Sequence, residues 1–318
     1  MTCWVAQMKP FDPEHRDDEE VVTFQAKSIA NGVCGMGWDL EGHFSDKNQT
    51  YWLADNNNKE NYKAAYRNRF SAATDKSGFA VALNQYARIK PGDYILTRLF
   101  ATSVCWIGKV TSYAYYDVQE KFKTDNGCYS WIVDVDWTYH APFLTLPDAL
   151  RGLMQTHMIT IKRVYSGTHC SIMQKLCGES VEPIGLTAEN FHESLDSNSL
   201  EDLVAFYIME SHKGFRLLPS TCKANEQTFE FLLENGDLKI TCQVKNMRKI
   251  DVVPYTDESL RKFDRIYLFS GLGYDNEPQA SNNIRIIPRE DLYHFLKLCY
   301  MNKDHFYNIL KDFYVFKD

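Results

Sequence analysis

The sequence predicts an α+β and α/β protein built from two domains. Residues 1–165 contain several short runs of strand-forming residues with two helical stretches between them, which favours a small β-barrel with inserted helices. Residues 197–318 follow the order α-β-β-β-α-β, which is typical of a sheet covered by helices. Residues 166–196 are predicted to be a linker with short helices. A chain of 318 residues is long enough for two cores of ordinary size.

The predicted strands of the first domain are rich in β-branched and aromatic residues and are bounded by Gly, Asp, Asn or Pro. They are CWVAQM, GVCGMGWDL, GDYILTRLF, SVCWIGKVTSYAYY, YSWIVDVDWTY and HMITIKRV. Between the second and the third, helices are predicted at about 58–72 and 76–88. The second helix ends just before Pro91 and Gly92, which are a helix stop and a turn signal.

The second domain opens with a predicted helix for which Ser199 is a candidate N-cap. Its apolar residues recur at helical spacing, at Leu200, Leu203, Val204 and Tyr207. Strands follow in FRLLPS, TFEFLLE and LKITCQVK, and the Asn-Gly pair at 235–236 predicts a hairpin between the last two. Two further strands and a helix are predicted at 265–270, at 284–288 and from about 289.

The composition is that of a globular, cytoplasmic protein without a membrane segment. Hydrophobic residues make up 44% and charged residues 24% of the chain, as in soluble folds. No signal peptide is expected, and no run approaches the roughly 18 apolar residues that cross a bilayer. The nine cysteines form no CxxC pair, which argues against structural zinc and disulfides and for a reducing cytosol.

The charge is unevenly distributed along the chain. A net charge of −7 argues against a general nucleic-acid binder. Residues 1–165 carry 18 Lys and Arg against 19 Asp and Glu, whereas residues 166–318 carry 17 against 23. A basic patch is therefore expected in the first domain rather than the second.

One predicted strand, at 238–246, carries polar residues that a core does not explain. Because side chains alternate along a strand, its apolar residues share one face, and Gln243 and Lys245 share the other. The predicted hairpin brings Glu230 beside them. A carboxylate and an amide oxygen can hold a hard cation such as Mg²⁺, and a lysine can orient water or stabilise charge on a phosphate. The alternative for an isolated Gln-x-Lys pattern is a solvated strand face.

Residues 197–290 resemble the PD-(D/E)XK nuclease superfamily, and specifically its Mrr-like restriction branch. The order of elements, Gln243-x-Lys245 on the third strand and Glu230 on the second carry the resemblance. Glu201 matches the glutamate that such nucleases often add from the first helix. The resemblance implies a catalytic set of Glu201, Glu230, Gln243 and Lys245, of which the first three bind Mg²⁺ or Mn²⁺. The usual second-strand residue of the superfamily is Asp, where this chain has Glu.

Most of residues 1–165 resemble a PUA-like domain of the EVE/YTH-related group. The resemblance depends on the order of four motifs, VCGMGWDLEG, IKPGDYILTR, CWIGKVTSYAYY and IVDVDWTYH. Some members of that group are fused to Mrr-like nucleases. In the group, an aromatic-walled pocket receives a base swung out of a nucleic acid, often a modified one. The resemblance therefore implies a base-reading domain ahead of the nuclease domain.

Several residues of the first domain are candidates for such a reader. The candidate pocket walls are Trp38, Trp106 and Trp137. Asp39 is a candidate for reading a base edge. Core packing is the alternative for each tryptophan. Lys63 and Arg67 share a helix face and are candidates for phosphate binding, with an ordinary solvated face as the alternative.

Together these features favour a modification-dependent, type IV-like restriction endonuclease that recognises a modified base in DNA and hydrolyses phosphodiester bonds, in defence against phage or foreign DNA. Cleavage of both strands needs two sites, so a homodimer is expected. Two alternatives stay open. One is a non-catalytic reader of modified nucleic acid whose nuclease fold is degenerate. The other is a barrel that binds a nucleotide signal and gates the nuclease.

Overall fold

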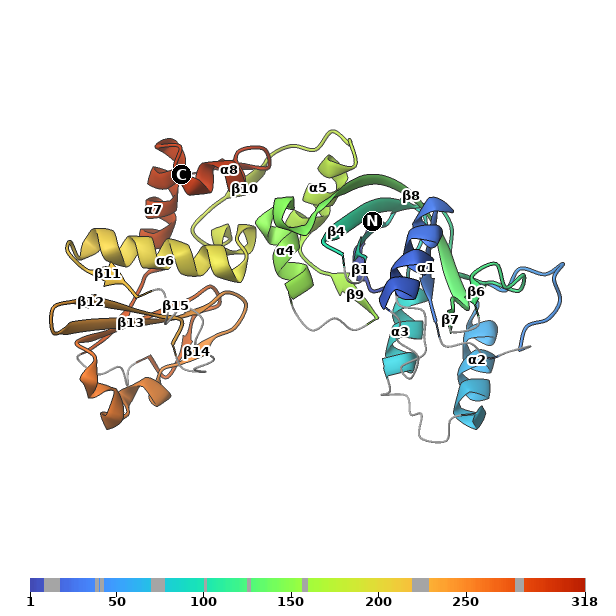
Figure 1. Ribbon diagram of the computed structural model, residues 1–318, viewed down its shortest axis with the longest axis horizontal. Coiled ribbons are helices and arrows are strands. Elements are labelled where there is room, and N and C mark those ends of the chain that lie inside the picture. The colour runs from blue at the N-terminus through green and yellow to red at the C-terminus, as the bar shows by residue number, and fades with distance from the viewer. Residues whose placement is uncertain are drawn as a thin grey trace. The chain divides into compact units, whose positions relative to one another are not determined.

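The computed structural model describes residues 1–8, 18–37, 40, 43–69, 78–99, 102–124, 127–155, 160–218, 229–277 and 283–317. The chain is a mixed α and β protein that divides into two compact units (Figure 1). The first comprises Met1–Leu146 and Leu153–Val181, and the second comprises Pro147–Gly152 and Glu182–Asp318. The segment predicted as a linker, 166–196, is divided between the two units. Its helix α5 (Gly167–Leu176) belongs to the first unit, and the residues from Glu182 onward belong to the second.

A curled half-barrel sheet forms the centre of the first unit (Figure 1). Its strand order is β2-β8-β4-β3-β1-β9, and β5 pairs with β8 outside this path. The strands are β1 (Cys3–Ala6), β2 (Val33–Met36), β3 (Tyr94–Arg98), β4 (Val104–Val110), β5 (Tyr115–Tyr116), β8 (Trp131–Pro142) and β9 (Ile161–Val164). Strand β8 pairs with β2, β4 and β5, and its register with β4 shifts beside Gly108. Such an irregularity bends a strand and favours the curl of the sheet.

Helices α1 (Asp18–Ala30), α2 (Asn56–Arg69) and α3 (Gly78–Tyr86) pack around an aromatic core. Helix α5 packs against β1 and β3, and the residues of α4 (Asp148–Gln155) are divided between the two units after Gly152. A small hairpin joins β6 (Lys123–Thr124) and β7 (Gly127–Cys128). Trp4, Tyr62 and Trp131 are at most 1% exposed, which accounts for part of the high aromatic content. The two inserted helices predicted from the sequence correspond to α2 and α3.

The second unit contains a mixed five-stranded sheet in the order β11-β12-β13-β15-β17. These strands are β11 (Arg216–Leu217), β12 (Phe231–Asn235), β13 (Leu238–Lys245), β15 (Arg265–Ser270) and β17 (Ile284–Ile286). The first three are antiparallel, and β13, β15 and β17 are parallel. Helix α6 (Ser197–Ser211) packs against β13 and against α7 (Arg289–Met301).

Smaller elements complete the second unit. Strand β10 (Ile184–Leu186) pairs with β18 (Tyr314–Phe316), and β14 (Ile250–Asp251) pairs with β16 (Tyr274–Asp275). Helix α8 (His305–Leu310) packs against α7. A 3₁₀ turn, Phe191–Ser194, precedes α6.

Three local features of the second unit differ from the sequence prediction. The N-cap of α6 is Asp196 rather than Ser199, because the Asp196 carboxylate accepts a hydrogen bond from the Ser199 backbone N–H. The hairpin turns at Gly236 and Asp237, with Asn235 paired to Leu238. Between β13 and β15, where the sequence assigns no element to particular residues, the chain forms 3₁₀ turns at Val253–Thr256 and Glu258–Lys262.

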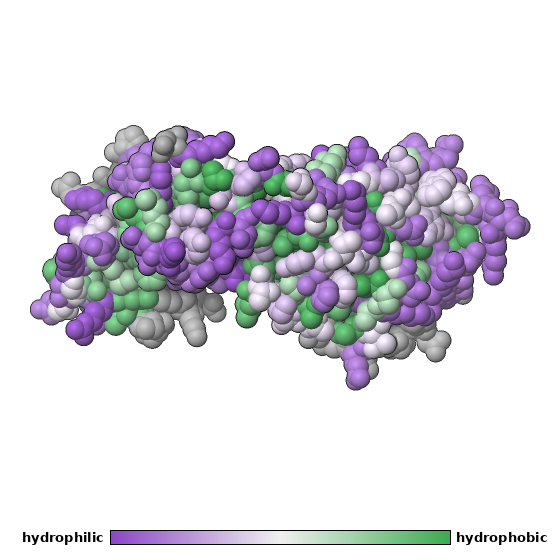
Figure 2. Space-filling model, turned by 90° about the horizontal axis from the view of Figure 1, so that it is seen from above, coloured by the Kyte–Doolittle hydropathy of each residue, from purple (hydrophilic) through white to green (hydrophobic). Residues whose placement is uncertain are grey.

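Polar and apolar residues are interspersed on the molecular surface. On the face shown in Figure 2, hydrophilic residues predominate and apolar ones are exposed in small groups. Among the described residues, no helix combines the length and the apolar character that crossing a bilayer requires.

Candidate functional site

A polar cluster lies at the end of the β12–β13 hairpin opposite its turn. Glu230 directly precedes β12, and its backbone N–H donates to the Cys242 carbonyl of β13 at 2.9 Å. The antiparallel register pairs Phe231 with Cys242, which places Glu230 beside Gln243. The convergence expected from the hairpin is therefore confirmed, although Glu230 precedes the strand rather than lying within it.

Hydrogen bonds join the side chains of this cluster. The Lys245 Nζ donates to Glu230 Oε1 at 3.0 Å, and Gln243 Nε2 donates to the same oxygen. The Tyr255 hydroxyl donates to Gln243 Oε1 at 3.3 Å. Gln243 is thus held at both ends of its amide group, and Glu230 Oε1 receives two donors.

The sheet face that carries Gln243 is covered. Gln243 and Thr241 are each 1% exposed. Their partners in the parallel register on β15 are Leu268 and Ile266, which belong to an apolar cluster with Ile250, Val252 and Ile284. A buried amide costs free energy unless it is hydrogen-bonded, and Gln243 meets this condition through its neighbours. The alternative of a solvated strand face is therefore wrong for Gln243.

The charged members of the cluster remain accessible at its edge. The side chain of Lys245 is 41% exposed and that of Glu230 is 22% exposed. Solvent can therefore reach the ammonium and the carboxylate from outside, while the amide behind them is fixed.

Glu201, on the second turn of α6, contributes a second carboxylate to the surroundings of the cluster. Burial, followed by the charge of Glu230, raises the pKa of Glu201 to about 7, whereas the charge of Lys245 opposes this shift. The charges of Asp202 and Asp196 act in the same direction as Glu230. Two carboxylates that repel each other in a partly buried position are a common feature of functional sites.

The two carboxylates suit a hard divalent cation, because a cation between Glu201 and Glu230 would cancel their repulsion. In the arrangement observed, the Gln243 amide nitrogen faces Glu230 and the amide oxygen accepts from Tyr255, so the amide would have to turn over to offer its oxygen to that cation. Within the described ranges, no group of three or more His, Cys, Asp or Glu side chains is arranged to hold a metal. A metal here would therefore depend on two carboxylates together with the amide of Gln243.

Tyr255 is a member of the cluster that sequence reasoning missed. It lies in the 3₁₀ turn Val253–Thr256, and its ring packs against the apolar cluster beneath the sheet. Burial, followed by the charge of Glu230, raises its pKa to about 12, so the phenol stays protonated and donates to Gln243. In the sequence VVPYTDE, the proline before the tyrosine predicts a turn. It does not predict that the tyrosine side chain contacts β13.

Of the four residues predicted to read a base, the structure describes two, Trp106 and Trp137. Trp38 and Asp39 lie outside the described residues. Trp106 and Trp137 are partly buried and pack against the aromatic core of the first unit, and Trp106 stacks on His140 at 4.6 Å. Both indole N–H groups are buried without a hydrogen-bond partner in the described part of the chain. Their role in base binding stays a prediction.

The two residues predicted to bind phosphate differ in exposure. Lys63 is buried, and its ammonium lies 2.9 Å from Glu60 Oε1. Arg67 is exposed on the same helix, α2. Since the Lys63 ammonium already has an anionic partner, a phosphate there would compete with Glu60.

Comparison with known proteins gives a match for the first unit. The profile of a family described as a domain of unknown function (DUF8426) matches residues 15–166. The matched segment contains the strands of the curled sheet from β2 to β9. No curated protein and no solved structure matches the chain.

Proposed function

We propose that this protein is a metal-dependent endonuclease of the modification-dependent, type IV-like restriction kind. The observation that carries the proposal is the convergence of Glu230, Gln243 and Lys245, which a hairpin joins through direct hydrogen bonds. The second carboxylate, Glu201, lies close enough for the charge of Glu230 to raise its pKa. The PD-(D/E)XK resemblance of residues 197–290 supports the same assignment.

Each residue has a role in the proposed hydrolysis. Glu201, Glu230 and Gln243 would hold Mg²⁺ or Mn²⁺, which supplies Lewis-acid activation of a water and of the phosphate when bound. The exposed ammonium of Lys245 donates hydrogen bonds to a non-bridging oxygen of the scissile phosphate and stabilises the charge that develops there. Tyr255 orients Gln243 by donating to its amide oxygen. In the balanced reaction, water oxygen bonds to phosphorus as the bond between phosphorus and the departing oxygen breaks, and the proton that the attacking water loses is matched by the proton that the departing alkoxide takes up from solvent.

The first unit would supply recognition of the DNA. The PUA-like resemblance supports a reader of a modified base, and the curled half-barrel sheet is compatible with it at the level of architecture. Cutting both strands requires two nuclease units, so we propose a homodimer acting on DNA in the cytoplasm, in defence against phage or foreign DNA.

The proposal is tested with plasmids that carry cytosine, 5-methylcytosine or 5-hydroxymethylcytosine, incubated with the protein with and without Mg²⁺ or Mn²⁺. We expect cleavage of a modified plasmid that depends on the metal and is absent in Lys245→Ala. The matched control is Lys239→Ala, an exposed lysine at the opposite end of the same strand. Absence of cleavage by the wild type on every plasmid with either metal would overturn the proposal.

A second candidate function is a non-catalytic reader of modified nucleic acid. The observation that favours it is that the protein itself supplies hydrogen-bond donors to Glu230, because its Oε1 already accepts from Gln243 and Lys245. In a binding module, these contacts would only hold the hairpin edge together. Retention of modified DNA without cleavage, and no change in that retention in Lys245→Ala, would support this second function.

A further inference from the structure

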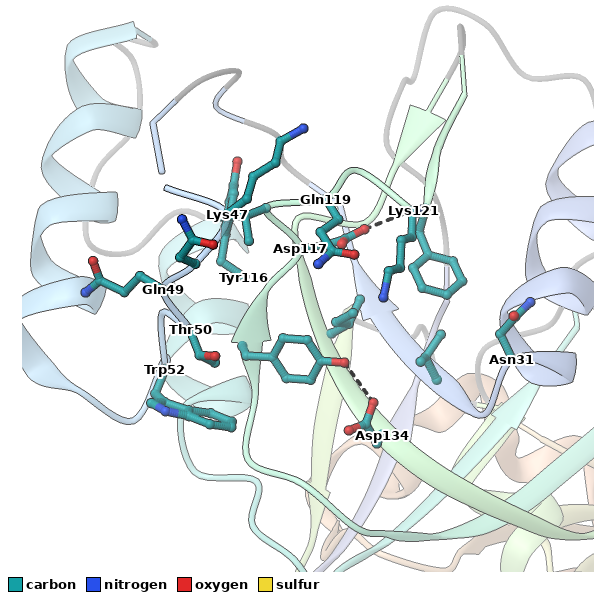
Figure 3. Close-up of a pocket in the computed structure, with 16 residues that line it drawn as sticks. Asn31, Lys47, Gln49, Thr50, Trp52, Tyr116, Asp117, Gln119, Lys121 and Asp134 are labelled. Carbon is teal, nitrogen blue, oxygen red and sulfur yellow. Dashed lines mark hydrogen bonds between the residues drawn. The ribbon is translucent and has the colours of Figure 1, made fainter. Parts of the chain in front are cut away.

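A pocket of about 450 Å³ opens in the first unit, and neither Trp106 nor Trp137 lines it. It lies between the segment before α2, the strands β5 and β8, and the end of α1 (Figure 3). Its volume is in the range of about 300–1,000 Å³ that is common for sites of small molecules. The residues that shape it are Trp52, Tyr115, Asp117, Asp134, Lys47 and Lys121.

Two aromatic rings form one wall of this pocket. Trp52 is 43% exposed, and its ring lies edge-to-face against Tyr115 at 5.9 Å and 72°. A backbone bridge joins the two residues, and Asn58 Nδ2 donates to the Trp52 carbonyl at 3.1 Å. The Tyr115 hydroxyl donates to Asp134 Oδ1 at 2.8 Å (Figure 3). Both rings are therefore held in place before any ligand arrives, which lowers the entropic cost of binding.

Charged side chains also line this pocket. Asp134 uses one carboxylate oxygen for Tyr115, and its second oxygen has no hydrogen-bond partner among the residues that the structure describes. That oxygen can accept from an exocyclic amino group of a planar ligand. Lys47 and Lys121 are exposed, and neither forms an ion pair with a described carboxylate. The charge of Lys121 also acts on the Asp117 carboxylate and opposes the rise of its pKa. Lys47 and the exposed Lys121 together favour an anion at the same site.

The buried carboxylate of Asp117 stabilises the shape of the pocket. Its Oδ2 accepts from the Phe122 backbone N–H at 3.0 Å, which closes the turn that carries Lys121. Burial raises the pKa of Asp117, and the backbone hydrogen bonds of the turn oppose this shift. The backbone of the turn that carries Lys121 is thus held in place by this hydrogen bond.

We propose that this pocket binds a nucleotide, with the base against Trp52 and the phosphate near Lys47 and Lys121. A ligand that satisfies the lining must combine a planar ring, hydrogen-bond donors for Asp134 and a negative charge, and a nucleotide with an exocyclic amine on its base has all three. The pocket deepens the proposed function by locating nucleotide recognition in the first unit. Binding here does not require that the second unit cuts DNA.

The proposal is tested by titration calorimetry on the full chain. The probes are AMP, CMP, UMP, a short single-stranded DNA and inorganic phosphate. We expect AMP or CMP to bind more tightly than UMP, which has no exocyclic amine, and more tightly than phosphate alone. Loss of the stacking ring in Trp52→Ala should weaken binding by about 5- to 150-fold. Trp52→Phe should retain most of the affinity.

Matched controls separate binding from folding. Tyr165→Ala removes an aromatic side chain that is 81% exposed in the same unit and does not line the pocket, so it should leave affinity unchanged. Preference for the oligonucleotide assigns the site to DNA, and preference for the mononucleotide assigns it to a free ligand; both outcomes support the pocket. The proposal is overturned if no nucleotide or oligonucleotide binds, or if Trp52→Ala, shown to be folded by thermal unfolding, binds as the wild type does. Because the readout is binding, failure of cleavage in the second unit leaves this test unaffected.

Discussion

Lys245 Nζ lies 3.0 Å from Glu230 Oε1, although the two residues are 15 positions apart and a hairpin separates them. Their side chains are 41% and 22% exposed, and an ion pair of such exposure stabilises a fold by at most about 1 kcal/mol. Stability is therefore a weak reason for this pair. The proposed function gives this pair another role, in which the ammonium interacts with a phosphate.

Lys245→Ala is expected to abolish DNA cleavage while the free energy of unfolding changes by less than about 1 kcal/mol. The ammonium would interact with charge that develops at phosphorus in the transition state, so its loss lowers turnover more than DNA affinity. Cleavage rate, DNA retention and urea unfolding are the measurements. Lys245→Arg should not restore cleavage, because a planar guanidinium does not replace a compact ammonium. Unchanged cleavage in Lys245→Ala would contradict the assigned role.

Glu230→Ala is expected to weaken the binding of Mn²⁺, measured by calorimetry, because it removes one of two carboxylates from the proposed ligand set. Glu230→Asp keeps the charge and restores the residue usual in the superfamily, so it should retain metal binding. The control is Glu234→Ala, which removes a carboxylate from β12, the strand that begins directly after Glu230. This variant should bind Mn²⁺ as the wild type does. Equal affinity in wild type and Glu230→Ala would remove Glu230 from the site.

Glu201 is expected to make stability depend on pH between about 4.5 and 7. Its pKa is raised from an ordinary 4.5 to about 7 in the folded protein. The folded state therefore holds a proton that the unfolded state has released. The contribution of Glu201 to stability is full below the unfolded pKa and is lost as the pH rises, by at most about 1.4 kcal/mol per pH unit.

Urea unfolding at several pH values measures this effect. Glu201→Gln should gain stability relative to the wild type as the pH rises from 5 to 8, whereas Glu290→Gln, an exposed control on α7, should not. If a cation binds between Glu201 and Glu230, Mg²⁺ should raise the melting temperature more at pH 8 than at pH 6. A wild type and Glu201→Gln with parallel pH profiles would show that burial does not perturb this carboxyl group.

The sequence correctly predicts which residues of the candidate site share a strand face. It does not predict which residues cover that face. Period-two alternation places Gln243 and Lys245 on one side of β13, and the Asn-Gly signal brings Glu230 beside them. The burial of Gln243 was not predictable, because its cover comes from residues such as Leu268 and Tyr255, which reach it through parallel pairing and a 3₁₀ turn. Local periodicity carries no information about such contacts.

The pocket beside Trp52 could not be predicted from the sequence pattern either. Trp52 stands in a polar stretch, QTYWLADNNN, without the alternation that marks a strand, and its partner Tyr115 is distant in the sequence. By contrast, Trp106 and Trp137 stand in clear strands, and their position there reflects packing against the core. An aromatic residue in a polar segment was the available signal for an exposed ring.

Trp106→Ala and Trp137→Ala are expected to destabilise the protein by about 2–4 kcal/mol, since truncation of a large aromatic ring leaves a cavity. Both rings pack against the aromatic core, and a Cβ on Gly108 would already lie 2.9 Å from the Trp137 ring. Trp52→Ala should cost less than about 1 kcal/mol because its ring is exposed. Thermal and urea unfolding of the three variants provide the comparison. Equal losses in all three would show that Trp52 is also part of the core.

Gly271→Ala is expected to lower cleavage activity through the position of Lys245. Gly271 follows β15, and its backbone N–H donates to the Lys245 carbonyl at 2.9 Å. A Cβ there would lie 2.4 Å from the Asn246 carbonyl oxygen and 2.5 Å from His192 Nδ1. Asn246 is itself anchored, because its Nδ2 donates to the Leu195 carbonyl at 3.0 Å. The added methyl group must therefore displace the backbone that follows Lys245.

Overpacking of this kind lowers the free energy of unfolding by about 1–3 kcal/mol. We expect the cleavage rate of Gly271→Ala to fall by a larger factor than the fraction of folded protein does. The control is Gly167→Ala at the start of α5, where an added Cβ meets no atom within 4 Å. That variant should be as stable as the wild type or slightly more stable, because alanine restricts the unfolded chain. Cleavage per folded molecule, with the folded fraction taken from urea unfolding, distinguishes a displaced Lys245 from simple destabilisation. A Gly271→Ala protein that cuts as fast per folded molecule as the wild type would show that the backbone after β13 does not position Lys245.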